Sequence, residues 1–137
     1  MREILFRGKC QTGEWVEGGF LNRNGKPEII DFDRAEEGDF TFCTPVDLTT
    51  VGQFTGLTDK NGVKIFEGDI VAFTAEDELW EPHYYQGFVY FCDGAFWVDC
   101  GKDNDDNDVL FSIGHALLAD KNIQVIGNIH DNPELLT

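Results

Sequence analysis

A strong hairpin signal occupies residues 84–98, which read YYQGFVYFCDGAFWV. Two aromatic-rich runs flank Asp93-Gly94, and an Asp-Gly pair between such runs is typical of a tight turn between antiparallel strands. Because large aromatic side chains carry much of the hydrophobic energy of a core, we expect this hairpin to anchor the core.

Further turn signals lie upstream of this hairpin. Residues 59–62 (DKNG) and 67–69 (EGD) each predict a tight turn, and the second leads into an apolar strand. Residues 11–13 and 22–26 predict turns near the N-terminus, since Gly and Asn tolerate the left-handed conformation. Residues 74–82 are acidic and irregular, which favours a loop.

Apolar and polar residues alternate in short runs along most of the chain, which is the period of half-buried strands. We therefore predict an all-β, mostly antiparallel fold in a single domain spanning residues 1–137. Residues 49–137 are expected to form a small SH3-like barrel, and residues 1–48 to add an N-terminal hairpin layer. Barrel closure would hide the strand edges that otherwise invite aggregation.

The chain is strongly acidic, with 26 Asp and Glu against 10 Lys and Arg and a formal net charge of −16. Such a charge repels a phosphate backbone, so direct nucleic-acid binding is disfavoured. It also attracts a basic protein surface, although solubility alone is a sufficient reason for it. No apolar run is long enough to cross a bilayer, and we expect a cytoplasmic protein without membrane contact.

Four widely spaced cysteines, Cys10, Cys43, Cys92 and Cys100, form no C-x-x-C pair and are expected to be free thiols. The sequence contains no zinc signature, nucleophile elbow or phosphate-binding loop. We therefore predict no catalytic residue, no metal site and no cofactor. Asp103, Asp105 and Asn107 have the spacing of a calcium loop, but Asp108 replaces its glycine and Gly114 its glutamate, which favours a solvated loop.

Three blocks of sequence resemble the YopX family in the order in which they occur. They are MREILFRGK with GEWVEG (1–9 and 13–18), VGQFTGLTDKNG with IFEGDIV (51–62 and 65–71), and VIGNIHDNPELL (125–136). The resemblance implies a small β protein encoded by phages and prophages of bacteria, in a family without an established activity. It therefore carries no catalytic role onto any residue of this chain.

Several residues are candidates for binding. Trp80 is the best interface candidate, because its acidic neighbours and Pro82 suit a surface loop. Glu67 and Asp69 flank a glycine and suit either an acid/base pair or, more simply, turn capping. The full set of candidate binding residues is Trp15, Gln53, Asp59, Glu67, Asp69, Trp80 and Asn128.

The sequence predicts a non-enzymatic accessory protein of bacterial phages that binds a host or phage protein. The most specific version of this hypothesis is an acidic decoy that occupies a basic surface. Two alternatives stay open. One is a small enzyme with a site near the Glu67, Asp69 and Asn128 turns. The other is a self-assembling structural protein, in which case the chain is a homo-oligomer.

Overall fold

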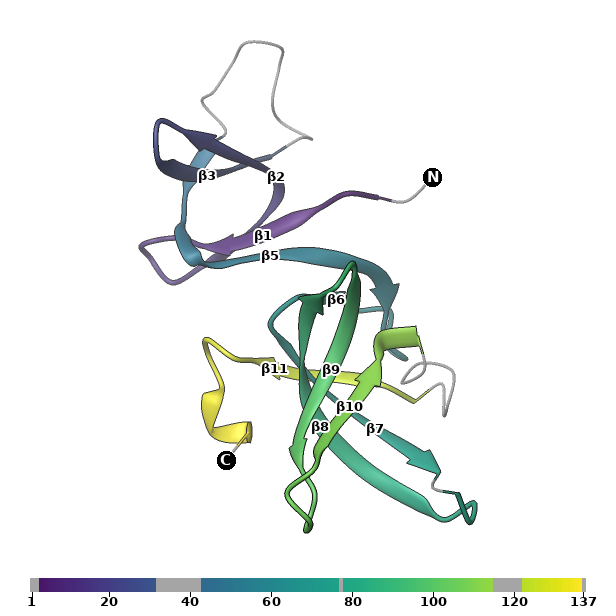
Figure 1. The fold of residues 1–137 in the computed structure, drawn as a ribbon. Coiled ribbons are helices and arrows are strands. Elements are labelled where there is room, and N and C mark those ends of the chain that lie inside the picture. The colour runs from purple at the N-terminus through teal and green to yellow at the C-terminus, as the bar shows by residue number, and fades with distance from the viewer. Residues whose placement is uncertain (1–2, 32–42, 77, 115–121, 137) are drawn as a thin grey trace. The chain divides into compact units, whose positions relative to one another are not determined.

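The computed structural model describes residues 3–31, 43–76, 78–114 and 122–136. The chain divides into two compact units, Met1–Gly56 and Leu57–Thr137. Their regular elements are almost entirely β-strands, as Figure 1 shows. The predicted all-β, antiparallel class is therefore confirmed.

Unit 1 is an antiparallel sheet. Its strands are β1 (Phe6–Lys9), β2 (Trp15–Arg23), β3 (Lys26–Ile30), β4 (Cys43–Pro45) and β5 (Asp47–Thr58), in the order β4-β3-β2-β1-β5. Asn24 and Gly25 join β2 to β3 with φ of 53° and 80°. Two successive positive φ angles match the right-handed twist of the flanking strands, which confirms the predicted turn.

Unit 1 combines apolar burial with a salt bridge in which the Glu28 side chain is buried and the Arg23 side chain is 47% exposed. Ile29 and Phe54 are 1% and 6% exposed. Glu28 is also buried, and its carboxylate accepts hydrogen bonds from Arg23 Nε at 2.9 Å and Nη2 at 3.1 Å. This two-point contact offsets the desolvation of Glu28.

Unit 2 contains the strands β6 (Lys64–Phe66), β7 (Asp69–Glu76), β8 (Pro82–Cys92), β9 (Ala95–Lys102), β10 (Asp108–Ser112) and β11 (Gln124–Asn128), followed by the short helix η1 (Pro133–Leu136). Five of these strands form an antiparallel sheet in the order β10-β9-β8-β7-β11. Strand β6 is not part of this sheet. It comes after β5 in the other sheet, whose full order is β4-β3-β2-β1-β5-β6, and the last two residues of β5 already belong to unit 2.

The core of unit 2 lies on one face of this sheet. Val89 of β8 and Val98 of β9 are register partners and are at most 1% exposed, so the hairpin of residues 84–98 does anchor the core. Because side chains alternate across a strand, Gln86, Phe88 and Asp99 lie on the opposite face. We call this opposite face the outer face of the sheet.

The loop predicted for residues 74–82 is wrong at its two ends, since residues 74–76 and Pro82 belong to strands. Strand β7 continues to Glu76 and β8 already begins at Pro82, and the two residues are register partners. Ala75, which directly precedes Glu76, is only 3% exposed because it packs into the core. Pairing and burial thus override the acidic composition of this segment.

Among the described residues, both strand orders have two ends, so no closed barrel is found and the SH3-like barrel stays a prediction. The predicted boundary falls between residues 48 and 49, whereas the compact units meet after Gly56. The difference arises because β5 is one continuous strand of 12 residues. Within the described ranges, no helix has the length and apolar character to cross a bilayer.

Candidate functional site

The β7–β8 hairpin ends in a group of exposed apolar side chains. Residues 77–81 alone connect the two strands, since pairing continues to Glu76 and Pro82. Leu79 is 80% exposed, Trp80 79% and Tyr84 65%. We call Leu79, Trp80 and Tyr84 the hairpin tip. Large apolar side chains gathered at the surface to this extent are typical of contact sites for other proteins.

The hairpin tip lies in a negatively charged environment. Glu76, Glu78 and Glu81 are exposed beside it. The sequence has no Lys or Arg between Lys64 and Lys102, so this long segment has an excess of negative charge. The tip therefore combines apolar contact area with a negative potential, which suits a partner surface of the opposite charge.

Trp80 also has an unusual backbone conformation, with φ of 62°. Bulky residues rarely adopt this left-handed conformation, which costs about 1–2 kcal/mol because Cβ approaches the neighbouring carbonyl oxygen. Glycine and asparagine adopt it at lower cost, yet a tryptophan occupies the position. Strain of this kind concentrates at functional sites, so it supports a binding role for the tip.

Asp59 has a structural position in unit 2. Its Oδ1 accepts hydrogen bonds from the backbone N–H of Asn61 at 2.8 Å and of Val63 at 2.9 Å, and its Oδ2 accepts one from Val125 at 2.9 Å. Burial alone raises the pKa of this carboxyl, but the hydrogen bonds from Val125, Val63 and Asn61 together outweigh burial and lower it. Asp59 thus fixes its own turn and ties that turn to β11.

The structure brings together two more of the predicted residues, Asp69 and Asn128, which are register partners on β7 and β11. The buried Asp69 carboxylate accepts a hydrogen bond from Phe66 N at 2.8 Å. Asn128 Oδ1 accepts from His130 N at 3.0 Å and from Asp131 N at 2.9 Å. Glu67 is half-buried in the turn before Asp69. Asp69 and Asn128 therefore use side-chain oxygens to cap backbone turns.

The remaining predicted residues, Trp15 and Gln53, lie in unit 1 on the strands either side of β1. The Arg7 guanidinium carbon lies 4.7 Å from the centre of the Trp15 ring, which is a cation–π contact. Gln53 is half-buried opposite Phe6. The predicted residues are thus distributed over both units, and the exposed Trp80 differs from the others.

The acidic loop before β10 supports its own turn. Asp103 Oδ1 accepts hydrogen bonds from Asp105 N and Asn107 N, both at 2.9 Å. The bond from Asn107 N is the main reason that the pKa of Asp103 is lowered. One oxygen of the carboxylate that would begin a calcium loop therefore already accepts two backbone N–H groups. No cluster of three or more His, Cys, Asp and Glu suited to a metal occurs in the described part of the chain.

Three turns share one hydrogen-bonding pattern; the sequence predicted the turns at residues 11–13 and 59–62 but not the pattern that the three have in common. They span residues 10–14, 59–63 and 103–107, and in each the first residue's N–H bonds the fifth residue's carbonyl while its own carbonyl accepts from the fourth. Asp59 and Asp103 occupy the first position in two of them, and Cys10 occupies it in the third. The signal is a residue with an acceptor side chain three positions before the residue of positive φ.

A family model for the YopX protein matches residues 5–137, which is nearly the whole chain. The chain belongs to the YopX family. The three sequence blocks that resemble this family are thereby confirmed, and the match also covers the region between the second and third blocks. No curated protein matches this YopX-family chain.

A solved structure is similar over its full length. It is the crystal structure of protein EF1440 from Enterococcus faecalis, which is 26% identical, with 100% of each chain covered and a TM-score of 0.56. The all-β arrangement of this YopX-family chain is therefore similar to that of a natural protein solved by crystallography.

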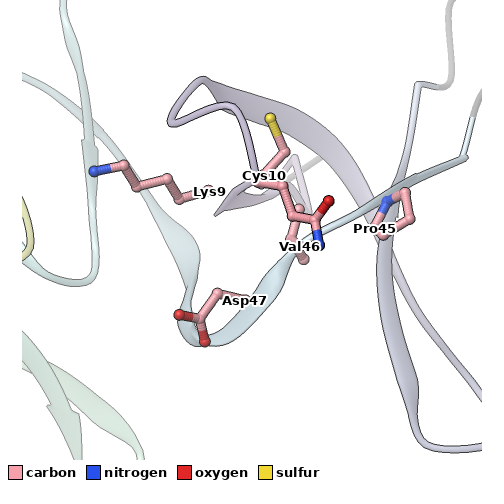
Figure 2. A pocket seen from close by; sticks show the side chains of 6 residues that line it. Lys9, Cys10, Pro45, Val46 and Asp47 are labelled. Carbon is pink, nitrogen blue, oxygen red and sulfur yellow. The ribbon is translucent and has the colours of Figure 1, made fainter.

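Unit 1 of this YopX-family chain has a cavity of about 480 Å³ beside Cys10. Lys9, Cys10, Pro45, Val46 and Asp47 line it, together with Gln11. Figure 2 shows that the Cys10 thiol and the Asp47 carboxylate point in opposite directions, so these two groups do not form a pair. Asp47 Oδ1 instead accepts hydrogen bonds from Thr49 N at 3.0 Å and from Thr49 Oγ1 at 2.8 Å.

We expect Cys10 to be alkylated at a lower pH than an ordinary thiol. Cys10 Sγ and Thr12 Oγ1 share a hydrogen bond of 3.0 Å, and this bond, followed by backbone hydrogen bonding from Thr12, lowers the pKa of Cys10. Burial, with the charge of Asp99, raises the pKa of Cys100 to about 12. Iodoacetamide labelling over a pH series, quantified for each cysteine by mass spectrometry, measures how the reactivity of Cys10 and of Cys100 depends on pH.

The control is Thr12→Val, which keeps the shape of the side chain and removes the hydroxyl. It should move the Cys10 labelling profile to higher pH and leave Cys100 slow to react. Identical Cys10 profiles in the wild type and in Thr12→Val would contradict the role of this hydrogen bond.

Proposed function

We propose that this YopX-family chain is a non-enzymatic accessory protein of a phage or prophage that binds another protein through its hairpin tip. The observation that carries the proposal is the exposure of Leu79, Trp80 and Tyr84 at the end of a paired hairpin. The partner that fits is a basic protein surface with an apolar pocket, because exposed glutamates flank the tip.

The polar candidates favour this proposal over a small enzyme. An acid/base pair at the Asp69 and Asn128 turns needs side-chain oxygens that can approach a substrate. Here the Asp69 carboxylate accepts a hydrogen bond from Phe66 N, and Asn128 Oδ1 accepts hydrogen bonds from two backbone N–H groups. Side chains held in this way stabilise the fold, and the hairpin tip is left as the surface best suited to contact.

The net charge of −16 favours the decoy form of the proposal, in which the chain covers a basic surface that would otherwise contact nucleic acid. Charge of this size accelerates association with a basic partner at low ionic strength, and salt screens the attraction. The complex is therefore expected to weaken as salt is added.

We expect Trp80→Asn to weaken binding about tenfold or more, since an exposed tryptophan that becomes buried in a complex often contributes over 1 kcal/mol. Asparagine tolerates the backbone conformation of Trp80, so the turn is retained. The test begins with capture of a partner from host lysate by the tagged protein at low and high salt. The partner is then identified by mass spectrometry, purified and titrated by calorimetry.

The matched control is Phe91→Ala. Phe91 is an aromatic residue on the same hairpin strand, 51% exposed, at the end of β8 away from the tip. This control should bind like the wild type. Equal affinity for Trp80→Asn and the wild type, or binding that is indifferent to salt, would overturn the proposal. A homo-oligomer that Trp80→Asn dissociates would replace the basic partner with a second copy of this chain.

A further inference from the structure

A second cavity lies on the outer face of the sheet in unit 2 and has a volume of about 270 Å³. Its lining includes Gln86 and Phe88 from β8, Asp99 and Gly101 from β9, and Leu135 and Leu136 from η1. This volume is just below the range of about 300–1,000 Å³ for pockets that hold drug-sized ligands. The cavity therefore suits a single side chain rather than a whole small molecule.

The cavity combines apolar walls with one carboxylate. Phe88, Leu135 and Leu136 supply apolar surface, and Asp99 supplies the charge. Gly101 N donates to Asp99 Oδ1 at 2.9 Å, which orients this carboxylate. The cation of the same strand, Lys102, pairs with Asp108 at 2.9 Å. Among the described residues, no ion pair is formed by Asp99.

The negative charge of Asp99 acts on its neighbours. Burial is the main cause of the raised pKa of Tyr90 on the outer face, and Asp99 adds to it. The same two causes raise the pKa of Cys100. A carboxylate that disfavours negative charge on nearby groups favours a positive charge at the same place.

We propose that this cavity binds the side chain of an arginine on the protein partner. The aliphatic stem of arginine packs against Phe88 and the two leucines, and the planar guanidinium donates to the Asp99 carboxylate and the Gln86 amide oxygen. This inference rests on the proposed function, because it names a residue type that the basic partner presents.

The position of the cavity agrees with one continuous contact surface. Tyr84 of the hairpin tip and Gln86 and Phe88 of the cavity alternate along β8, so they lie on the same face of the sheet. Four residues of strand, or roughly 13 Å, separate Tyr84 from Phe88. One extended segment of a partner can therefore contact Tyr84 and place an arginine in the cavity.

The test uses N-acetyl-arginine methylamide as the probe and its neutral isostere, N-acetyl-citrulline methylamide, as the comparison. Both are titrated into the ¹⁵N-labelled full chain and followed by amide chemical shifts. We expect the arginine probe alone to shift a localised group of amides, those of Gln86, Phe88, Gly101 and Leu135. Asp99→Asn should weaken its binding about fivefold or more.

Asp93→Asn is the matched control, because it removes one negative charge from the same β8–β9 hairpin. Asp93 is exposed in the tight turn with φ of 51°, a conformation that asparagine tolerates. This variant should bind the probe like the wild type. Equal weakening by the two variants, equal binding of the citrulline probe, or shifts spread over the acidic surface would each overturn the proposal.

The arginine titration and the partner titration test the cavity and the hairpin tip independently, so a negative result in one does not decide the other. If the arginine probe does not bind and Trp80→Asn still weakens the partner complex, the cavity assignment is wrong and the hairpin tip stands. If the probe binds at the cavity and Trp80→Asn has no effect on the partner, the tip is wrong and the cavity stands as an independent arginine site.

Discussion

Replacing Asp59 with alanine lowers the free energy of unfolding by about 3 kcal/mol, because hydrogen bonds to a charged group each contribute about 1.5–3 kcal/mol and are not fully additive. The substitution leaves the backbone N–H groups of Asn61, Val63 and Val125 without their acceptor. Val125 is the decisive one, since it lies 66 residues away in the sequence and belongs to β11. Urea unfolding followed by circular dichroism measures the loss.

Asp103→Ala is the control, because Asp103 occupies the same position in an equivalent turn. Its turn is exposed and its carboxylate bonds no distant strand among the described residues, so water replaces the lost acceptor and the expected loss is much smaller than for Asp59→Ala. Equal losses for the two variants would show that the bond to Val125 contributes nothing.

The same carboxylate makes stability depend on pH. Folding lowers the pKa of Asp59 below its ordinary value of 3.8, so the protonated form is disfavoured in the folded protein. Its stabilisation is therefore fully present above that unfolded value and is lost as the pH falls through the folded pKa. Asp59→Ala should lose less stability than the wild type over this acidic range, which the same urea measurement detects.

Local sequence patterns predicted the strands because pairing and burial follow the same alternation. The Asp93-Gly94 turn and the flanking aromatic runs specify a hairpin with Val89 and Val98 inside. The same reasoning failed at residues 74–76, where the chain is polar but its neighbour strand is long enough to pair with it. The polar composition of such a segment indicates only that one of its faces is exposed to solvent. The length of the hairpin depends on pairing with the neighbouring strand.

The candidate residues were predicted as a set, but their roles depend on contacts between distant residues. The sequence marks Asp59 as a turn residue, and no local pattern indicates its bond to Val125. Trp80 was selected from its acidic neighbours, and its exposure of 79% agrees with that choice. The cavity near Asp99 was not predicted at all, because η1 and β9 are brought together only by the fold.

Gly18→Ala is expected to destabilise the protein by about 3 kcal/mol or more, because overpacking against rigid backbone is among the costly substitutions. Gly18 is buried in β2, and an added Cβ would overlap the backbone carbonyl oxygen of Ile30 on β3. It would also lie 3.2 Å from the Ile29 side chain. Ile29 is 1% exposed and cannot move outward without opening the interior of unit 1.

The β2–β3 pairing decides the size of this effect, since Gly19 and Ile30 are register partners and hold the two backbones together. Gly114→Ala is the control, because a Cβ at that position meets no atom of the described residues within 4 Å. It should change the free energy of unfolding by no more than about 0.5 kcal/mol, as surface substitutions usually do. Urea unfolding of both variants against the wild type makes the comparison. A Gly18→Ala protein as stable as Gly114→Ala would mean that β2 and β3 do not approach as closely as their register requires.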